Sequence, residues 1–303
     1  MKTFERRFLF VTGKGGVGKT TVSACLARAL SSRGRRVLLA ATDPAGYGDL
    51  LPNALWLDDP QPCGERLFTV QLEPEAALRE YGRLLIKPRL ARQAVFENRF
   101  VQGFLKGLPG LPQWAVLGKA WYHTTEMEEG VPRFDSVVFD APATGHAVEL
   151  LRLPRVIAEL APAGLLRRDA ELAWELLSDP GRTCIALVTL PEELPSNETS
   201  ELATRIANEL GLPLGAVLMN RLRPLLFQPD ERNALTGLEA FDPAAPGGAA
   251  LEAARLRAIA ESVQLDSETR LAEVRAPLFQ LPELDSANGQ ELLGGLLRVL
   301  QQT

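Results

Sequence analysis

The sequence has few cysteines, few aromatic residues and no clustered positive charge. Its three cysteines, Cys25, Cys63 and Cys184, form no C-x-x-C pair. A structural zinc site or an iron–sulfur cluster therefore finds no support, because both usually take thiolates from closely spaced cysteines. Cys25 and Cys184 lie in apolar segments, so we expect their thiols to be buried in the core.

Basic runs and long apolar runs are also missing. The formal net charge at pH 7 is −5, so nucleic acid is not an expected partner, since backbone binding depends on clustered cations. No apolar stretch reaches the roughly 18 residues that a transmembrane helix needs. The apolar segment 8–12 is too short for a signal peptide. These absences predict a cytoplasmic protein.

Continuously apolar segments separated by helical patterns predict an α/β fold. The segment 7–12 is expected to be a buried strand, 20–32 a helix that ends before Gly34, and 36–43 a second buried strand. This unit implies a doubly wound, mostly parallel sheet with helices on both faces. Further strands are predicted at 67–72, 134–140, 184–190, 214–220 and 277–281, and further helices at 199–210, 249–270 and 290–301.

The chain is expected to form one domain over residues 1–303. Helical patterns interrupted by proline and glycine dominate 74–130, and a second helical piece covers 155–180. We predict that these two insertions form a helical subdomain on the α/β core. The segment 241–250 is rich in proline, glycine and alanine and is expected to be a surface loop.

The segment 13–20 reads GKGGVGKT and fits the phosphate-binding pattern G-x-x-x-x-G-K-[ST] of a P-loop NTPase. Its glycines let the backbone wrap a phosphate, so that successive N–H groups point at the anion beside a helix N-terminus. Lys19 is expected to reach the β and γ oxygens, and Thr20 to bind Mg²⁺ through its hydroxyl. The predicted contacts to ATP or ADP are Gly13, Lys14, Gly15, Gly16, Val17, Gly18, Lys19, Thr20 and Thr21.

Two aspartates end predicted strands. Asp43 ends the strand 36–43 and Asp140 ends the strand 134–140. Open α/β sheets bind ligands at the carboxyl ends of their strands. A P-loop site needs a carboxylate near Mg²⁺ and a group that positions the attacking water. We therefore expect both aspartates at the phosphate site, although an Asp-Pro turn at Asp43 and a turn cap at Asp140 are alternatives.

The stretches GKGGVGKTT (13–21), TDPAG (42–46) and DAPATGH (140–146) together resemble the motifs of the ArsA family. That family comprises arsenical-pump ATPases and the ATPases that target tail-anchored membrane proteins. Downstream segments at 191–199, 218–221 and 281–282 extend the resemblance over nearly the whole chain, most weakly in the helical insertions. The resemblance implies an ATP hydrolase that uses Mg²⁺.

Family roles then fall on individual positions. Asp43 matches the catalytic aspartate that orients the attacking water, and Asp140 matches the Mg²⁺-linked Walker B aspartate. The implied metal-site residues are Thr20, Asp43 and Asp140. The implied adenine-side contacts are Asn220, Arg221 and Pro282. In the second switch, Gly145 is placed to sense the γ-phosphate, and His146 matches a switch hydrogen bond better than a general base.

Lys14 makes this the deviant form of the P-loop, similar to that of MinD, ParA, the nitrogenase iron protein and the arsenical-pump ATPases. In that group the lysine crosses a dimer interface to the partner's nucleotide. The resemblance implies that Lys14 is catalytic together with Lys19 and Asp43, and that the chain is a homodimer or pairs with a paralogous chain. A solvated loop lysine is the alternative.

Several positions depart from the family pattern. Gly46 replaces the first-switch histidine, which predicts a more flexible switch. The cysteines do not have the spacing of a metalloid site, and only Cys63 is expected to be exposed. The helical segments 84–117 and 156–177 fit either a subdomain core or a small client groove. The segment 292–300 is expected to pack on the sheet rather than bind a membrane, because its polar face lacks lysines.

The leading hypothesis is a Mg²⁺-dependent ATPase of the ArsA type, a nucleotide-driven dimer that acts on a protein client or a membrane-protein partner. One alternative is a nucleotide-dependent regulatory or scaffold module with low turnover. Another is the motor subunit of an arsenite or antimonite efflux pump. A membrane- or DNA-positioning protein like MinD or ParA is least favoured, because the charge balance is acidic and the C-terminal segment is apolar.

Overall fold

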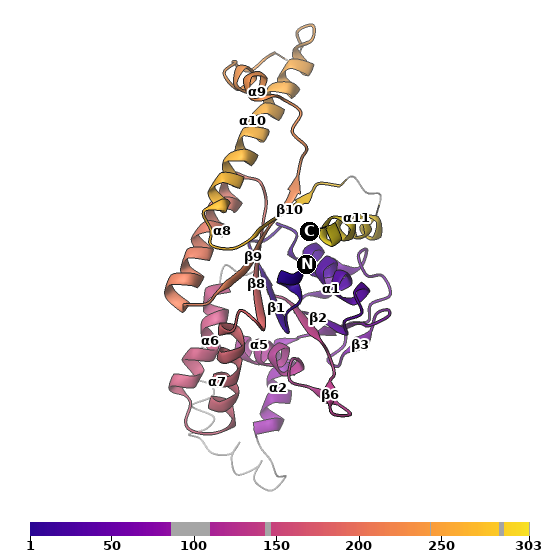
Figure 1. Cartoon of the computed structure of the whole chain (residues 1–303), viewed down its shortest axis with the longest axis vertical. Helices are drawn as coiled ribbons and strands as arrows, with labels where there is room; N and C mark the ends of the chain where they lie inside the picture. The colour runs from indigo at the N-terminus through magenta and orange to yellow at the C-terminus, as the bar shows by residue number, and fades with distance from the viewer. Residues whose placement is uncertain (86–109, 143–146, 243, 285–287, 303) are drawn as a thin grey trace.

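The computed structural model describes residues 1–85, 110–142, 147–242, 244–284 and 288–302. Its main sheet has eight strands in the order β10-β9-β8-β1-β7-β2-β4-β3. All neighbours in this sheet pair in parallel except β3 with β4. Helices lie on both faces of the sheet (Figure 1), so the predicted doubly wound, mostly parallel α/β fold is confirmed.

The elements follow one another in a largely alternating order. The strands of the main sheet are β1 (Phe8–Thr12), β2 (Val37–Ala41), β3 (Gln61–Pro62), β4 (Leu67–Gln71), β7 (Ser136–Asp140), β8 (Thr183–Thr189), β9 (Leu214–Leu222) and β10 (Leu278–Pro282). The α-helices are α1 (Lys19–Ser32), α2 (Pro74–Leu85), α5 (Leu111–His123), α6 (Ala147–Leu160), α7 (Leu165–Ser178), α8 (Glu193–Arg205), α9 (Pro229–Thr236), α10 (Gly248–Ala272) and α11 (Gly289–Gln302).

The central strands are buried on both faces, which explains why their sequences are apolar without alternation. Every residue of β1, β2, β7 and β8 is buried. Along β1, Leu9 and Val11 join the core beneath α1, whereas Phe8 and Phe10 join the core beneath α5, α6 and α8. Because β1 lies in the middle of the sheet, the loop that follows it opens near the centre of the molecule.

The C-terminal helix α11 packs against α1 on one face of the sheet (Figure 1). Its Leu293, Leu296 and Leu300 are buried in the same core as Leu26 of α1. The segment 292–300, predicted to pack on the sheet, is thus buried on one face of it, mainly against α1. Across the described segments, no helix combines the length and apolarity that a bilayer span requires.

The predicted helical insertions are described only in part. Segment 74–130 contains α2 and α5, residues 86–109 lie outside the described chain, and a hairpin of β5 (Met127–Glu128) and β6 (Val131–Pro132) ends it. Segment 155–180 falls on α6 and α7, which pair with each other. Trp114, Ile157 and Ala170 belong to a separate small core there, which favours core packing in these helices. Their division into a subdomain stays a prediction.

Two predicted boundaries are wrong. The expected loop 241–250 ends early, because α10 starts at Gly248 after Gly247 turns the chain at φ 76°. The helix expected at 199–210 begins instead at Glu193, and its last turn, Ile206–Leu210, is π-helical. Pro195 does not delay this start, because the N–H groups of a first helical turn have no helical acceptor. The long α10 carries α9 away from the sheet (Figure 1).

Candidate nucleotide site

The glycine-rich loop joins β1 to the N-terminus of α1, as the sequence predicts. Gly13, Gly16 and Gly18 have φ of 149°, 83° and 91°, which side-chain-bearing residues rarely adopt. Two of them also leave no room for a side chain. A Cβ on Gly13 would lie 2.2 Å from the carbonyl oxygen of Val188, and a Cβ on Gly18 would lie 2.4 Å from Nδ2 of Asn220. The loop is therefore pressed against β8 and β9 behind it.

Gly13→Ala is expected to lower the free energy of unfolding by about 1–3 kcal/mol, because the added methyl group meets backbone and not a flexible side chain. Urea denaturation without nucleotide measures this change. Gly15→Ala is the matched control, since a Cβ there has no heavy atom within 4 Å. Overlapping denaturation curves for wild type and Gly13→Ala would contradict the described loop conformation.

Lys19 is buried inside the loop, with 7% of its surface exposed. Its Nζ donates a hydrogen bond to the carbonyl oxygen of Lys14 at 2.8 Å. Burial lowers the pKa of Lys19, and the charge of Asp140 opposes that shift. The cation is thus held in the concave side of the loop by the loop's own backbone, where an anion could take over its hydrogen bond.

Asp140 ends β7 beside the loop and beside the end of β2. It pairs in register with Val11 of β1 and Ala41 of β2. Its Oδ2 accepts hydrogen bonds from the hydroxyls of Thr20 at 3.1 Å and Tyr47 at 2.8 Å. Burial raises the pKa of Asp140, whereas the bonds from Tyr47 and Thr20 and the charge of Lys19 lower it.

The residues around Asp140 fit a magnesium ion. Its Oδ1 is buried and has no hydrogen-bond partner among the residues that the structure describes. A buried carboxylate oxygen without a partner is costly unless something binds it. The described residues contain no cluster of three or more His, Cys, Asp or Glu side chains suited to a metal. Mg²⁺ needs none, because it typically binds one or two carboxylates together with water and substrate phosphates.

Asp43 lies two residues after β2, because this strand ends at Ala41 and not at Asp43 as predicted; β2 is the strand next to β7. Its side chain is exposed, and its Oδ1 accepts a hydrogen bond from the backbone N–H of Ala45 at 3.0 Å, capping the 3₁₀ turn η2 (Pro44–Tyr47). The Asp-Pro turn that was an alternative for this residue is therefore present. The predicted roles in orienting water and binding metal stay predictions, since no described bond joins Asp43 to Thr20 or Asp140.

Gly46 lies in the same turn and closely approaches Thr20. A Cβ on Gly46 would lie 3.1 Å from Cγ2 of Thr20. Its φ is not in the left-handed region, so the close packing against Thr20, and not the backbone conformation, favours a glycine here. The expectation of a more flexible switch remains untested, and the second-switch residues Gly145 and His146 lie outside the described chain.

Lys14 forms an ion pair with Glu198 of α8. Its Nζ lies 2.7 Å from Oε1 of Glu198, and the two side chains are 41% and 40% exposed. Such a half-exposed pair contributes little to stability, on the order of 0–1 kcal/mol. Lys14 can therefore exchange this partner for another anion at small cost.

The adenine-side residues lie at the ends of β9 and β10. Asn220 is buried beneath the loop, where its Nδ2 donates to the carbonyl oxygen of Val17 at 3.0 Å and its Oδ1 accepts from the N–H of Arg221. Pro282 pairs with Leu222 in the sheet. In this arrangement Asn220 supports the phosphate loop, and the contacts of Asn220, Arg221 and Pro282 to adenine remain predictions.

Sequence reasoning missed two polar side chains of this site. Tyr47 follows the TDPAG motif but was given no role, and Glu198 was noted only as part of a family match. The bond from Tyr47 to Asp140 and the pairing of Lys14 with Glu198 join positions far apart in the chain. The one feature of the sequence that could have pointed to Tyr47 is its position directly after Gly46, the glycine that replaces the family's histidine.

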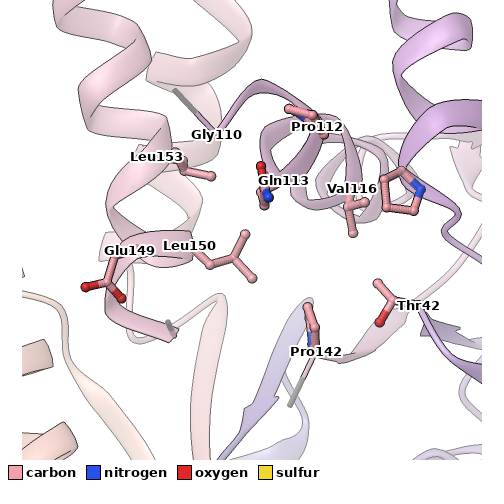
Figure 2. Close-up of a pocket in the computed structure, with 10 residues that line it drawn as sticks. Thr42, Gly110, Pro112, Gln113, Val116, Pro142, Glu149, Leu150 and Leu153 are labelled. Carbon is pink, nitrogen blue, oxygen red and sulfur yellow. The ribbon is translucent and has the colours of Figure 1, made fainter. Parts of the chain in front are cut away.

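An apolar pocket of about 410 Å³ lies between the strand ends and the helices α5 and α6. Figure 2 shows Thr42 and Pro142 facing Val116 of α5 and Leu150 of α6 across it. Thr42 precedes Asp43, and Pro142 is two residues after Asp140. The pocket thus borders both segments that are expected to respond to the nucleotide.

Comparison with known proteins gives a consistent result. Residues 6–163 match the family described as "Anion-transporting ATPase". The ATPase BagA of Mycobacterium tuberculosis is 32% identical over 232 residues, which cover 74% of this chain and 68% of that protein. The ATPase GET3 of Kluyveromyces lactis is 27% identical over 252 residues, which cover 71% and 72%.

An arsenical pump-driving ATPase of Escherichia coli is 29% identical over 234 residues, which cover 72% of this chain but only 40% of the pump ATPase. The activity of that longer protein as a whole therefore does not carry over. What its name shares with the other relatives is ATPase activity. With the phosphate loop, Lys19 and the carboxylate of Asp140 assembled at the carboxyl end of the sheet, the chain belongs to the ArsA family of anion-transporting ATPases and is an ATP hydrolase.

Proposed function

We propose that this ATPase depends on Mg²⁺ and works as a nucleotide-driven dimer, either of two identical chains or with a paralogous chain. Binding of ATP closes the dimer, hydrolysis opens it, and the helices next to the switches transmit the change to a protein client or a membrane-protein partner. The observation that carries the proposal is the buried Oδ1 of Asp140, which no described residue hydrogen-bonds, beside Thr20 and the buried cation of Lys19.

The residues divide the chemistry among them. Thr20 and Asp140 would hold Mg²⁺, which when bound would neutralise charge on the β- and γ-phosphates. The loop amides and Lys19 would bind the phosphates, and Lys19 would leave the carbonyl of Lys14 to do so. Asp43 would orient the attacking water from the end of β2. Each role uses a group that already lies at the carboxyl edge of the sheet.

The dimer is supported by the position of Lys14. Its Nζ pairs with Glu198 of α8, whereas Nζ of Lys19 donates to the backbone of the loop itself. Two lysines of one loop therefore face different surroundings. A partner's nucleotide phosphates would offer Lys14 more negative charge than the single carboxylate of Glu198 does.

The transmission to a client is supported by the apolar pocket of Figure 2. Its walls join the strand ends that carry the switches to α5 and α6, so a shift of either switch would change the packing of these helices. This part of the proposal names no particular client.

Calorimetry with ADP tests the core of the proposal. Binding heat is expected with Mg²⁺, and Lys19→Ala is expected to abolish it, because the phosphates lose their main cation. Phosphate release from ATP should likewise stop in EDTA. If ADP gave no binding heat with Mg²⁺ present, the assignment of this loop would be wrong.

The low-turnover alternative has one supporting observation, the pairing of Lys14 with Glu198 within one chain. If the ion pair between Lys14 and Glu198 persists in the nucleotide-bound protein, hydrolysis would be slow until a partner protein separates the two side chains. Turnover that stays low at every protein concentration and rises only with an added partner would favour this regulatory module over the autonomous dimer.

Arsenite is expected to leave ATP turnover unchanged. Cys25 and Cys184 are buried, and burial raises the pKa of each thiol to about 12, so neither supplies a thiolate near neutral pH. The half-buried Cys63 alone cannot form a three-coordinate thiolate site. Turnover measured with and without arsenite or antimonite checks this, and clear stimulation would revive the pump-motor hypothesis.

A further inference from the structure

Tyr47 connects the first switch to the carboxylate that is placed to bind metal. It is fully buried, and its hydroxyl donates a hydrogen bond to Oδ2 of Asp140 at 2.8 Å. Its ring packs on Trp56, with ring centroids 4.7 Å apart. A buried phenol whose hydroxyl donates a hydrogen bond to a carboxylate restrains the orientation of that carboxylate.

The neighbouring residue, Gly46, allows the turn that carries Tyr47 to pack closely on α1. With no side chain at Gly46, the turn η2 lies against Thr20, and a Cβ there would already approach Cγ2 of Thr20 to 3.1 Å. The turn therefore packs closely on Thr20, which donates its own hydroxyl to the same carboxylate oxygen as Tyr47. Gly46 thus allows the turn to approach Thr20, and Tyr47 forms the hydrogen bond to Asp140.

The two hydrogen bonds on Oδ2 of Asp140 differ in kind. The hydroxyl of Thr20 would serve two groups, because its oxygen would bind the proposed magnesium ion while its proton is donated to Asp140. The hydroxyl of Tyr47 is shielded in the core and is not exposed to the ion. Tyr47 is therefore the donor that restrains Oδ2, while Oδ1 has no hydrogen-bond partner among the described residues and is left for the ion.

The turn η2 has a functional group at each end. Asp43 caps its start, and Tyr47 is its last residue. We propose that Tyr47 is a positioning residue for Asp140, and that the short turn between Asp43 and Tyr47 couples occupancy of the magnesium site to the placement of the water-orienting carboxylate. The inference rests on the proposed function, because it needs magnesium at Thr20 and Asp140.

The test is the Mg²⁺ requirement of Tyr47→Phe, which keeps the ring and removes the hydroxyl. The Mg²⁺ concentration that gives half-maximal thermal stabilisation of the ADP-bound protein is expected to rise about tenfold, the lower end of effects seen when outer-shell partners of metal ligands are removed. ADP affinity in EDTA is expected to change less than twofold, because the loop contacts are untouched.

Tyr81→Phe is the matched control. Tyr81 also donates its hydroxyl to an aspartate, Asp169, at 3.1 Å, but this pair lies between α2 and α7 and away from the phosphate loop. The control should show the same Mg²⁺ requirement as wild type. Unfolding midpoints in EDTA report the structural cost of each lost hydrogen bond separately, and a merely structural Tyr47 would lower the midpoint only.

The outcomes separate this inference from the proposed function. If wild type shows no Mg²⁺-dependent stabilisation with ADP, the magnesium site itself is wrong. If wild type shows it and folded Tyr47→Phe has the same half-maximal Mg²⁺ concentration, the site stands and the positioning role of Tyr47 is refuted. A tenfold rise in Tyr47→Phe alone supports the inference.

Discussion

Lys14→Ala is expected to lower ATP turnover about 10³-fold, the lower end of the effect of a cation that reaches the transition state from a partner chain. ADP binding to the isolated chain should change little, because Lys14 pairs with Glu198 within its own chain and is proposed to contact the partner's nucleotide. Phosphate release and ADP calorimetry measure the two effects. Arg28→Ala, which removes a cation from the far part of α1, serves as the control.

Mixing two inactive variants tests whether Lys14 acts across the dimer. An equal mixture of Lys14→Ala and Asp43→Asn chains forms mixed dimers in which one site has Asp43 in place and receives Lys14 from its partner. Turnover of about one quarter of the wild-type value is expected, since about half of the dimers are mixed and each has one intact site. No recovery in the mixture would place the action of Lys14 within its own chain.

Asp43→Asn is expected to lower turnover about 10²-fold or more, because the neutral amide neither accepts the proton of the attacking water nor orients it as a carboxylate does. ATP and ADP affinities should stay within a few-fold of wild type. Single-turnover phosphate release separates the chemical step from product release. The hydrogen bond to Ala45 can be kept by the amide oxygen, so the turn should remain folded.

Asp49→Asn is the matched control for that experiment. Asp49 is an exposed aspartate shortly after the same turn, and its substitution should leave turnover unchanged. Equal turnover for Asp43→Asn and wild type would mean that another group orients the water. The segment 143–146 of the second switch, which contains His146, would then be the first place to look.

The core of the site could be predicted because its signals are local. The glycine pattern, Lys19 and Thr20 are contiguous in the chain, and their conformation follows from the residues themselves. The strands β1, β2 and β7 are buried on both faces, so their sequences are mainly apolar and can be recognised as strands. Parallel pairing then brings Asp140 to the same edge as the loop.

The rest depends on long-range packing that no single segment encodes. Tyr47 meets Asp140 only because η2 folds back against Thr20, and Lys14 meets Glu198 only because α8 packs beside the loop. The close approach of Gly46 to Thr20 could not be predicted, because these residues meet only when the turn folds onto α1, and the prediction of a flexible switch stays a prediction. The hydrogen bond from the Asn220 amide to the loop was likewise not predicted, and the contact of Asn220 to the base stays a prediction.

That last contact has a consequence for the thermodynamics of ligand capture. The amide of Asn220 supports Val17 from behind, and the ammonium group of Lys19 closes the loop from within through the carbonyl of Lys14. The phosphate loop is shaped by hydrogen bonds within the chain, so its conformational entropy is lost during folding and not when a ligand binds. When a nucleotide triphosphate binds, Lys19 would exchange the carbonyl of Lys14 for the phosphates, and the loop would not first have to become ordered.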